Sequence, residues 1–92
     1  MSSQTISEKV TTRTLKAMKT EGERIACMTA YDAAFSSVLD KVGVDLILVG
    51  DSVGMVVQGH DTTIPVSMEE MVYHTQLVVR GNERAMIMAD MP

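Results

Sequence analysis

Apolar runs and helix-like spacings alternate along the chain. Strands are predicted at 24–29, 46–50 and 84–89, since each contains a short, unbroken apolar run that is too short to form a helix. The segments between them place apolar residues at the i, i+3, i+4, i+7 positions of a helical face. The predicted order is helix, strand, helix, strand, long loop, helix and strand. This alternation predicts an α/β fold with parallel strands joined by right-handed crossovers.

The first two predicted helices are recognised by a polar residue before them and a glycine after them. Thr12 is expected to cap a helix over 13–21 that ends at Gly22. Asp32 is expected to cap the second, which ends at Gly43. The predicted buried face of the second helix consists of Phe35, Val38, Leu39 and Val42.

The third helix has a capping-box sequence at its start. Ser67 and Glu70 stand at the spacing at which each side chain bonds the other's backbone N–H. Gly81 is expected to end this helix. Its predicted buried stripe consists of Met68, Met71, Val72, Thr75 and Val79.

The rest of the chain is organised around the central strand and the polar turn after it. The run Leu46–Val49 leads into Gly50-Asp51-Ser52-Val53-Gly54, where the backbone can turn sharply and polar groups can face a ligand. Parallel α/β folds place their chemistry at this end of a strand. Asp51 is therefore the main functional candidate. The alternative is that Asp51 only forms a turn or caps a helix.

The predicted third strand ends in a second acid, Asp90. The carboxyl ends of parallel strands meet at one sheet edge, and neighbouring strands lie about 4.8 Å apart. Asp51 and Asp90 can therefore meet at one site. Two carboxylates suit Mg²⁺, which takes waters or substrate oxygens at its other positions. The competing interpretation is that each acid only orders its own loop.

The long loop 52–66 contains His60, which either contacts a substrate or orders the loop through a hydrogen bond. His74 lies within the third helix and is expected at a helical surface or interface. Neither histidine has a partner at a metal-ligand spacing such as His-x-x-x-His, and Ser52 has no neighbouring histidine that would make it a nucleophile.

Composition narrows the class of protein. The chain has 92 residues, which allows one domain, and its 46% hydrophobic content indicates a globular character. The net charge is −4 and the eight Lys and Arg residues are scattered, which argues against a nucleic-acid partner. No apolar run approaches the ~20 residues of a membrane span, and no signal peptide is visible, so a cytoplasmic protein is expected. The single cysteine, Cys27, lies in an apolar run and is predicted to be a buried, inert thiol.

Several motifs together resemble one enzyme family. They are Thr29-Ala-Tyr-Asp32, Val49-Gly-Asp-Ser-Val-Gly-Met55, Gln58-Gly-His-Asp-Thr-Thr-Ile-Pro-Val66, Tyr73-His74 and Ala89-Asp-Met-Pro92. In this combination they resemble ketopantoate hydroxymethyltransferase, and the likeness runs from about Thr12 to Pro92. The resemblance implies transfer of a hydroxymethyl group from 5,10-methylenetetrahydrofolate to 3-methyl-2-oxobutanoate, which gives 2-dehydropantoate in pantothenate biosynthesis. It also implies a (β/α)₈ barrel, Mg²⁺ and a cytoplasmic, usually decameric, assembly.

The resemblance also assigns roles to three residues. Asp51 and Asp90 fall on the metal-binding acids, and all three of Asp51, Ser52 and Asp90 fall on substrate-binding positions. Tyr31 and His60 are further possible contacts from loops. Met91 replaces the leucine of the family's Ala-Asp-Leu-Pro pattern, a mild change of similar volume. In this chemistry Mg²⁺ stabilises the enolate that forms when the C3 proton of the 2-oxo acid is removed.

A complete barrel of this kind needs about 250 residues, so three strand–helix units are about three eighths of the circle. The family's remaining metal-site Glu, a substrate-binding Lys and a later catalytic Glu are expected beyond Pro92, and no catalytic residue is assigned within the chain. We therefore expect a flexible N-terminus over 1–11 and an incomplete barrel domain over 12–92. A piece with two open sheet edges is expected to be inactive and poorly stable alone.

Two other functions remain open from the residues. One is another Mg²⁺-dependent barrel enzyme acting on 2-oxo acids, of the phosphoenolpyruvate mutase and isocitrate lyase kind. The other is a non-enzymatic flavodoxin-like signalling or binding domain with Asp51 as phosphoacceptor. That fold expects a five-stranded sheet in about 120 residues, and the chain lacks it.

Overall fold

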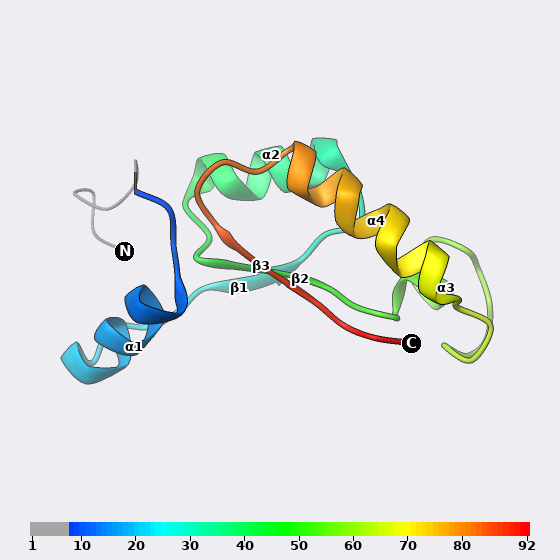
Figure 1. The fold of residues 1–92 in the computed structure, drawn as a ribbon, viewed down its shortest axis with the longest axis horizontal. Helices are drawn as coiled ribbons and strands as arrows, with labels where there is room; N and C mark the ends of the chain where they lie inside the picture. The colour runs from blue at the N-terminus through cyan, green and yellow to red at the C-terminus, as the bar shows by residue number, and fades with distance from the viewer. Residues whose placement is uncertain (1–7) are drawn as a thin grey trace.

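A computed structural model describes residues 8–92 as a small α/β structure (Figure 1). The strands are β1 (Cys27–Thr29), β2 (Leu46–Val49) and β3 (Met86–Ala89). The helices are α1 (Thr12–Glu21), α2 (Ala33–Val42), α3 (Val53–Val56) and α4 (Met68–Arg80). The predicted alternation of strands and helices is confirmed. The four-residue helix α3 was not predicted and begins the segment that we expected to be an irregular loop.

The three strands form one parallel sheet in the order β1-β2-β3. Thr29 pairs with Leu48, and Val49 pairs with Ala89. The strands therefore end together, and the loops that follow them lie at the same edge of the sheet.

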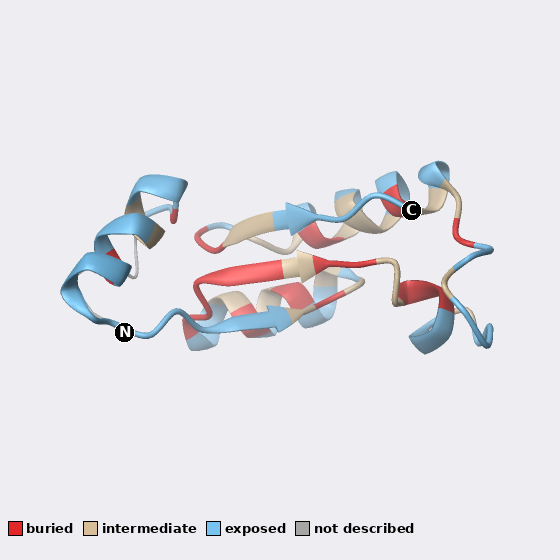
Figure 2. Ribbon diagram, turned by 90° about the horizontal axis from the view of Figure 1, so that it is seen from below, coloured by how far each residue is buried: buried red, intermediate tan, exposed pale blue. Residues whose placement is uncertain are grey.

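Helices α2 and α4 lie side by side on one face of this sheet (Figure 1). Figure 2 looks onto the other face, where the buried central strand lies between two more exposed neighbours. Ile47 and Val49 of β2 are fully buried toward the helices. The core is built from aliphatic residues: Ala30, Leu39, Val44, Ile47, Val49, Val53, Val66, Met71, Val78 and Ala85. The core thus lies between β2 and the helix pair.

The predicted buried face of α2 is wrong at three of its four positions. Leu39 is buried, but Phe35, Val38 and Val42 are 49%, 54% and 68% exposed. The buried face instead contains Ser36, whose hydroxyl donates to the carbonyl oxygen of Val78 on α4 at 2.7 Å. A small residue at this point lets the two helices approach closely, and the apolar stripe is turned away from the sheet and from α4.

The predicted stripe of α4 is also wrong in part. Met71 is buried, but Met68, Val72 and Val79 are about half exposed, and Val78 is buried in their place. The end of α4 packs so closely on α2 that a Cβ on Gly81 would lie 2.1 Å from the Ala33 carbonyl oxygen. This close approach explains the glycine, whose φ of −89° is open to other residues.

The helix-capping residues are those predicted from the sequence, except that the N-cap of α1 lies one residue earlier. Gly22 and Gly43 end α1 and α2 in the left-handed conformation, with φ of 76° and 95°. Asp32 caps α2, and Ser67 and Glu70 form the predicted capping box of α4. The N-cap of α1 is Thr11, rather than Thr12, because Thr11 forms a reciprocal capping box with Thr14.

The prediction that Cys27 is buried is wrong, since its side chain is exposed. Cys27 pairs with Leu46 in an edge strand and points to the sheet face that α2 and α4 leave open. The apolar run around it therefore marks a strand, without implying burial on both faces.

The predicted flexible segment 1–11 falls largely outside the described residues, which begin at Glu8, and its mobility stays a prediction. Val10 within it is buried, and its N–H donates to the carbonyl oxygen of Arg84 at 2.8 Å. Within residues 8–92, every helix is too short or too polar to cross a membrane.

Candidate active site at the carboxyl edge of the sheet

The turn after β2 and the end of β3 lie next to each other. The N–H of Asp90 donates to the Val49 carbonyl oxygen at 2.9 Å, which joins the two strand ends. A Cβ placed on Gly50 would lie 3.6 Å from Ser52 Oγ and 3.9 Å from Asp90 Oδ2. The hydroxyl of Ser52 and a carboxylate oxygen of Asp90 therefore approach the same point above Gly50. The structure thus brings Ser52 and Asp90 together above Gly50, and the meeting of the Asp51 and Asp90 carboxylates at one metal site stays a prediction.

The two acids keep carboxylate oxygens available to a ligand. Within residues 8–92 the Asp51 side chain makes no hydrogen bond and is only partly exposed, while its backbone carbonyl accepts the Gly54 N–H at 3.0 Å. Asp90 uses Oδ1 to accept the Met91 N–H at 3.1 Å, which leaves Oδ2 toward Gly50. The turn is thus made by the Asp51 backbone, and its carboxylate is not needed for it.

The donor set fits a hard divalent cation in part. Mg²⁺ binds oxygen ligands and often takes only one or two from carboxylates, with waters and substrate completing its octahedron. Asp51 and Asp90 can supply two such oxygens. No group of three or more His, Cys, Asp or Glu side chains suited to a metal ion occurs among residues 8–92. Substrate, water or other protein groups would have to complete the coordination.

Ser52 is held from a different loop. Its side chain makes no cap bond to α3, although it occupies the N-cap position, and Ser52 Oγ lies 2.6 Å from the Tyr31 hydroxyl. Tyr31 follows β1, and its carbonyl oxygen accepts a hydrogen bond from His74 Nδ1 at 2.8 Å. This link between the ends of β1 and β2 was not predicted from the sequence, although Tyr31 is the second residue after β1, just as Asp51 is the second residue after β2. His74 is at a helix interface, as expected.

His60 is exposed and contributes to the loop through its backbone. Its N–H donates to the Gly54 carbonyl oxygen at 2.8 Å, so the expected loop-ordering bond exists but does not use the imidazole. The loop is fastened to α4 by Gln58, whose side-chain amide donates to Glu70 at 2.7 Å. Glu70 therefore closes the capping box and anchors the loop at the same time.

The Glu70 carboxylate should make the folding stability of the chain decrease as the pH falls into the acid range. Its bonds from the Ser67 backbone N–H and hydroxyl lower the pKa of the Glu70 carboxyl below its ordinary value of 4.5, with the Gln58 amide and nearby His60 adding to this. A lowered folded-state pKa contributes stability that is present above the unfolded value and is lost as pH falls through the folded value. We expect the difference in urea midpoint between the parent chain and a Glu70→Gln variant to shrink as pH falls below 4.5. A Glu69→Gln variant, altered at the exposed neighbouring position, should show no such trend; an equal trend would contradict this explanation.

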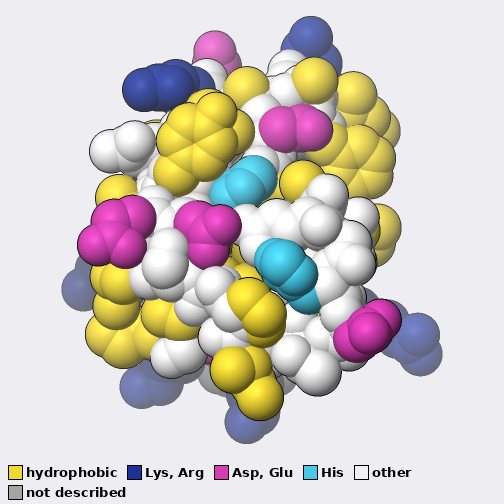
Figure 3. Space-filling model, turned by 90° about the vertical axis from the view of Figure 1, so that its right-hand side faces the viewer, with side chains coloured by type: hydrophobic (Ala, Val, Ile, Leu, Met, Phe, Trp, Pro, Cys, Tyr) yellow, Lys and Arg dark blue, Asp and Glu magenta, His cyan; other side chains and the backbone are white. Residues whose placement is uncertain are grey.

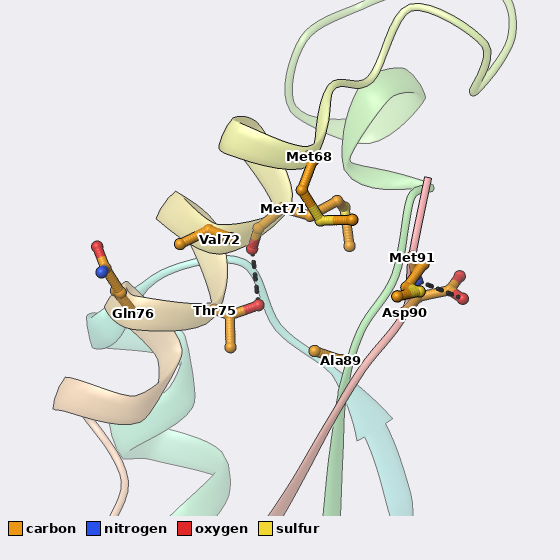
Figure 4. Close-up of a pocket in the computed structure, with 8 residues that line it drawn as sticks. All are labelled: Met68, Met71, Val72, Thr75, Gln76, Ala89, Asp90 and Met91. Atoms are coloured by element: carbon orange, nitrogen blue, oxygen red, sulfur yellow. Dashed lines mark hydrogen bonds between the residues drawn. The ribbon is translucent and has the colours of Figure 1, made fainter.

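An apolar cavity of about 290 Å³ lies beside the site, on the helix side of the sheet (Figure 4). Met68, Met71 and Val72 of α4 line one wall, and Ala89 and Met91 line the other. Asp90 also borders it, but its carboxylate points away from α4 in Figure 4. Of the residues that line the cavity, Asp90 alone also belongs to the polar group of Asp51, Ser52 and Asp90.

Acidic, histidine and apolar side chains lie close together at this end of the molecule, which Figure 3 views directly. The nearest basic residues in that view lie at the periphery. The end of the molecule seen in Figure 3 therefore combines acidic, histidine and apolar side chains, with the basic side chains at its rim.

Comparison with known proteins identifies the family to which this chain belongs. A family model described as ketopantoate hydroxymethyltransferase matches residues 9–92. The chain is 58% identical over 83 residues to a 3-methyl-2-oxobutanoate hydroxymethyltransferase of Marinobacter nauticus, covering 90% of this chain and 31% of the relative. A protein of the same name from Syntrophus aciditrophicus is 51% identical over 92 residues, covering 100% and 34%. The chain thus spans about a third of the length of these relatives. It belongs to the ketopantoate hydroxymethyltransferase family.

Proposed function

We propose that this chain supplies part of the active site of an enzyme that makes 2-dehydropantoate. The enzyme would transfer a hydroxymethyl group from 5,10-methylenetetrahydrofolate to 3-methyl-2-oxobutanoate. The observation that carries this proposal is the convergence of Ser52 and Asp90 above Gly50, next to Asp51, in a member of this family. The names of the relatives support the acceptor acid and the group transferred.

The three residues would bind the 2-oxo acid in two ways, the two acids through Mg²⁺ and the serine directly. Asp51 and Asp90 would hold Mg²⁺ by their carboxylate oxygens. When bound, the cation would withdraw electron density from the substrate's ketone oxygen and make the C3 proton easier to remove. The Ser52 hydroxyl would donate a hydrogen bond to the substrate carboxylate, which fixes the acid in one orientation.

The other catalytic and binding groups of the enzyme would come from outside these 92 residues. We propose that the general base and the folate site belong to other parts of the enzyme, since the chain spans about a third of its relatives' length. We propose that the 92-residue chain is inactive alone. The family resemblance makes a cytoplasmic decamer our expectation for the whole enzyme.

The sheet topology supports a (β/α)₈ barrel for the whole enzyme. The strands follow one another in chain order, and both connecting helices cover the same face. A flavodoxin-like sheet has the order 2-1-3-4-5 with helices on both faces, which does not match. The open face carries Leu46, Leu48, Met86 and Met88, in register across β2 and β3. Such aliphatic residues suit the packed interior of a barrel.

A chimaeric enzyme tests the proposal. The matched 83-residue segment of the Marinobacter nauticus relative is replaced by the corresponding residues of this chain. We expect the chimaera to convert 3-methyl-2-oxobutanoate and 5,10-methylenetetrahydrofolate to 2-dehydropantoate in a Mg²⁺-dependent reaction, followed by mass spectrometry. The 92-residue chain should show no turnover. A chimaera that is folded by circular dichroism and yet neither binds nor converts the 2-oxo acid would contradict the proposed function.

A further inference from the structure

The short contact between Tyr31 and Ser52 joins two loops at the edge of the sheet. The two hydroxyl oxygens are 2.6 Å apart, and both residues are partly buried. Ser52 stands before α3 but makes no side-chain bond to that helix. Within residues 8–92, the Tyr31 hydroxyl is therefore the group that orients the Ser52 side chain.

The direction of this hydrogen bond follows from what Ser52 has to bind. A serine hydroxyl has one hydrogen to donate, and a carboxylate can only accept. If Ser52 donates to the substrate carboxylate, its own oxygen is left to accept from Tyr31. The phenol then holds Ser52 Oγ in place and keeps its hydrogen free for the substrate. Hydrogen bonds in such a chain polarise one another in the same direction.

The backbone around Tyr31 is fixed on both sides, so its hydroxyl has little freedom. The preceding N–H, of Ala30, donates to Leu48 at 3.2 Å, and the following residue, Asp32, is the N-cap of α2. The Tyr31 carbonyl accepts from His74 Nδ1 at 2.8 Å. A carbonyl oxygen cannot donate, so Nδ1 of His74 must carry the hydrogen. The Tyr31 ring also packs against the core.

We propose that Tyr31 is a positioning residue that orients the Ser52 hydroxyl toward the substrate carboxylate, with His74 fixing the backbone of Tyr31. This inference rests on the proposed function, because it needs Ser52 to bind the 2-oxo acid. The Tyr31 hydroxyl would not touch the substrate itself, and it would affect substrate binding only through Ser52. The three residues come from three separate segments of the fold, the ends of β1 and β2 and helix α4.

The test measures binding of 3-methyl-2-oxobutanoate to the chimaera by titration calorimetry in the presence of Mg²⁺. Tyr31→Phe keeps the ring and removes the hydroxyl, and we expect it to raise Kd about fivefold to tenfold, as for loss of one hydrogen bond that supports a charged contact. Tyr73→Phe is the matched control. It removes the hydroxyl of a tyrosine that is 56% exposed and lies on α4, and it should leave Kd unchanged.

A double-variant cycle separates positioning from a general structural effect. In a Ser52→Ala background, Tyr31→Phe should have no further effect on Kd, because the group through which it acts is gone. His74→Asn offers an N–H near the position of Nδ1 and should keep most of the affinity, while His74→Leu should lose about as much as Tyr31→Phe.

The outcomes distinguish this inference from the proposed function. A chimaera that binds and converts the acid, but whose Kd is unchanged by Tyr31→Phe, keeps the function and overturns the inference. Equal losses from Tyr31→Phe with and without the Ser52 hydroxyl also overturn it. A chimaera with Tyr31 intact that fails to bind the acid overturns both.

Discussion

Replacing Asp90 by Asn in the chimaera should lower the rate of hydroxymethyl transfer by about a hundredfold or more. Changes to groups that merely support a metal ligand typically cost 10- to 100-fold in affinity or activity, so loss of a ligand's own charge should cost at least as much. The substitution keeps the shape of the side chain and one acceptor oxygen, but it removes half of the negative charge that Asp51 and Asp90 offer to Mg²⁺. The measurement is initial rate against Mg²⁺ concentration, and half-maximal rate should require more Mg²⁺.

The stability of the Asp90→Asn variant should be close to that of its parent. The Asp90 side chain is exposed and, among the residues from Glu8 onward, accepts only the N–H of the adjacent Met91, a bond that Asn can also accept. Asp32→Asn is a matched control beyond the end of β1, because Asn caps a helix as well as Asp does. Full activity of the Asp90→Asn variant at low Mg²⁺, or an equal loss in Asp32→Asn, would contradict a metal-binding role for Asp90.

The position of the polar site could be predicted from the sequence because it depends on topology. Once Leu46–Val49 and 84–89 are recognised as successive parallel strands, Asp51 and Asp90 must follow them at one edge. Helix ends were predictable for a similar reason, since Ser67 and Glu70 satisfy each other's backbone groups locally. In each case the contacts involved are set by neighbours in the chain or by strand order.

The buried faces of the helices could not be predicted in this way. The spacing of Phe35, Val38 and Val42 gives a helical stripe but does not say what covers it, and within residues 8–92 nothing buries it. The contact of α2 with α4 instead uses a small polar residue, Ser36, facing Val78. The bond between Tyr31 and Ser52 spans 21 positions in the sequence, and only the folded backbone brings these hydroxyls together.

The opposite edge of the sheet is organised by buried charges that stabilise the fold. Asp45, just before β2, is 1% exposed, and Arg84, before β3, is 5% exposed. Their side chains form an ion pair at 3.3 Å, and Arg84 also donates to the Val44 carbonyl oxygen at 3.2 Å. The remaining oxygen of Asp45 accepts the N–H of Ala26 at 3.0 Å. The pair therefore joins the starts of all three strands at the end remote from the candidate site.

Replacing Asp45 by Asn should destabilise the protein by about 3–5 kcal/mol, which is typical when one partner of a buried ion pair is removed. The variant removes the carboxylate charge that faces the Arg84 guanidinium at 3.3 Å, although the side chain keeps its size. In the chimaera, the loss should appear as a lower urea midpoint with an unchanged slope. In the 92-residue chain, whose sheet has two open edges, a loss of this size should abolish any cooperative unfolding transition.

A second variant shows whether the charge or the shape of Asp45 matters. Asp45→Leu combined with Arg84→Met replaces both charges by apolar side chains, and it should be markedly more stable than Asp45→Asn alone, because neither charge of the pair stays buried. The Mg²⁺ dependence of the chimaera should be unaffected in both variants, since the pair lies at the far edge of the sheet. If the double variant is no more stable than the single one, the cost comes from the lost hydrogen bonds to Ala26 and the strand backbones, and the explanation by loss of the Asp45 charge is wrong.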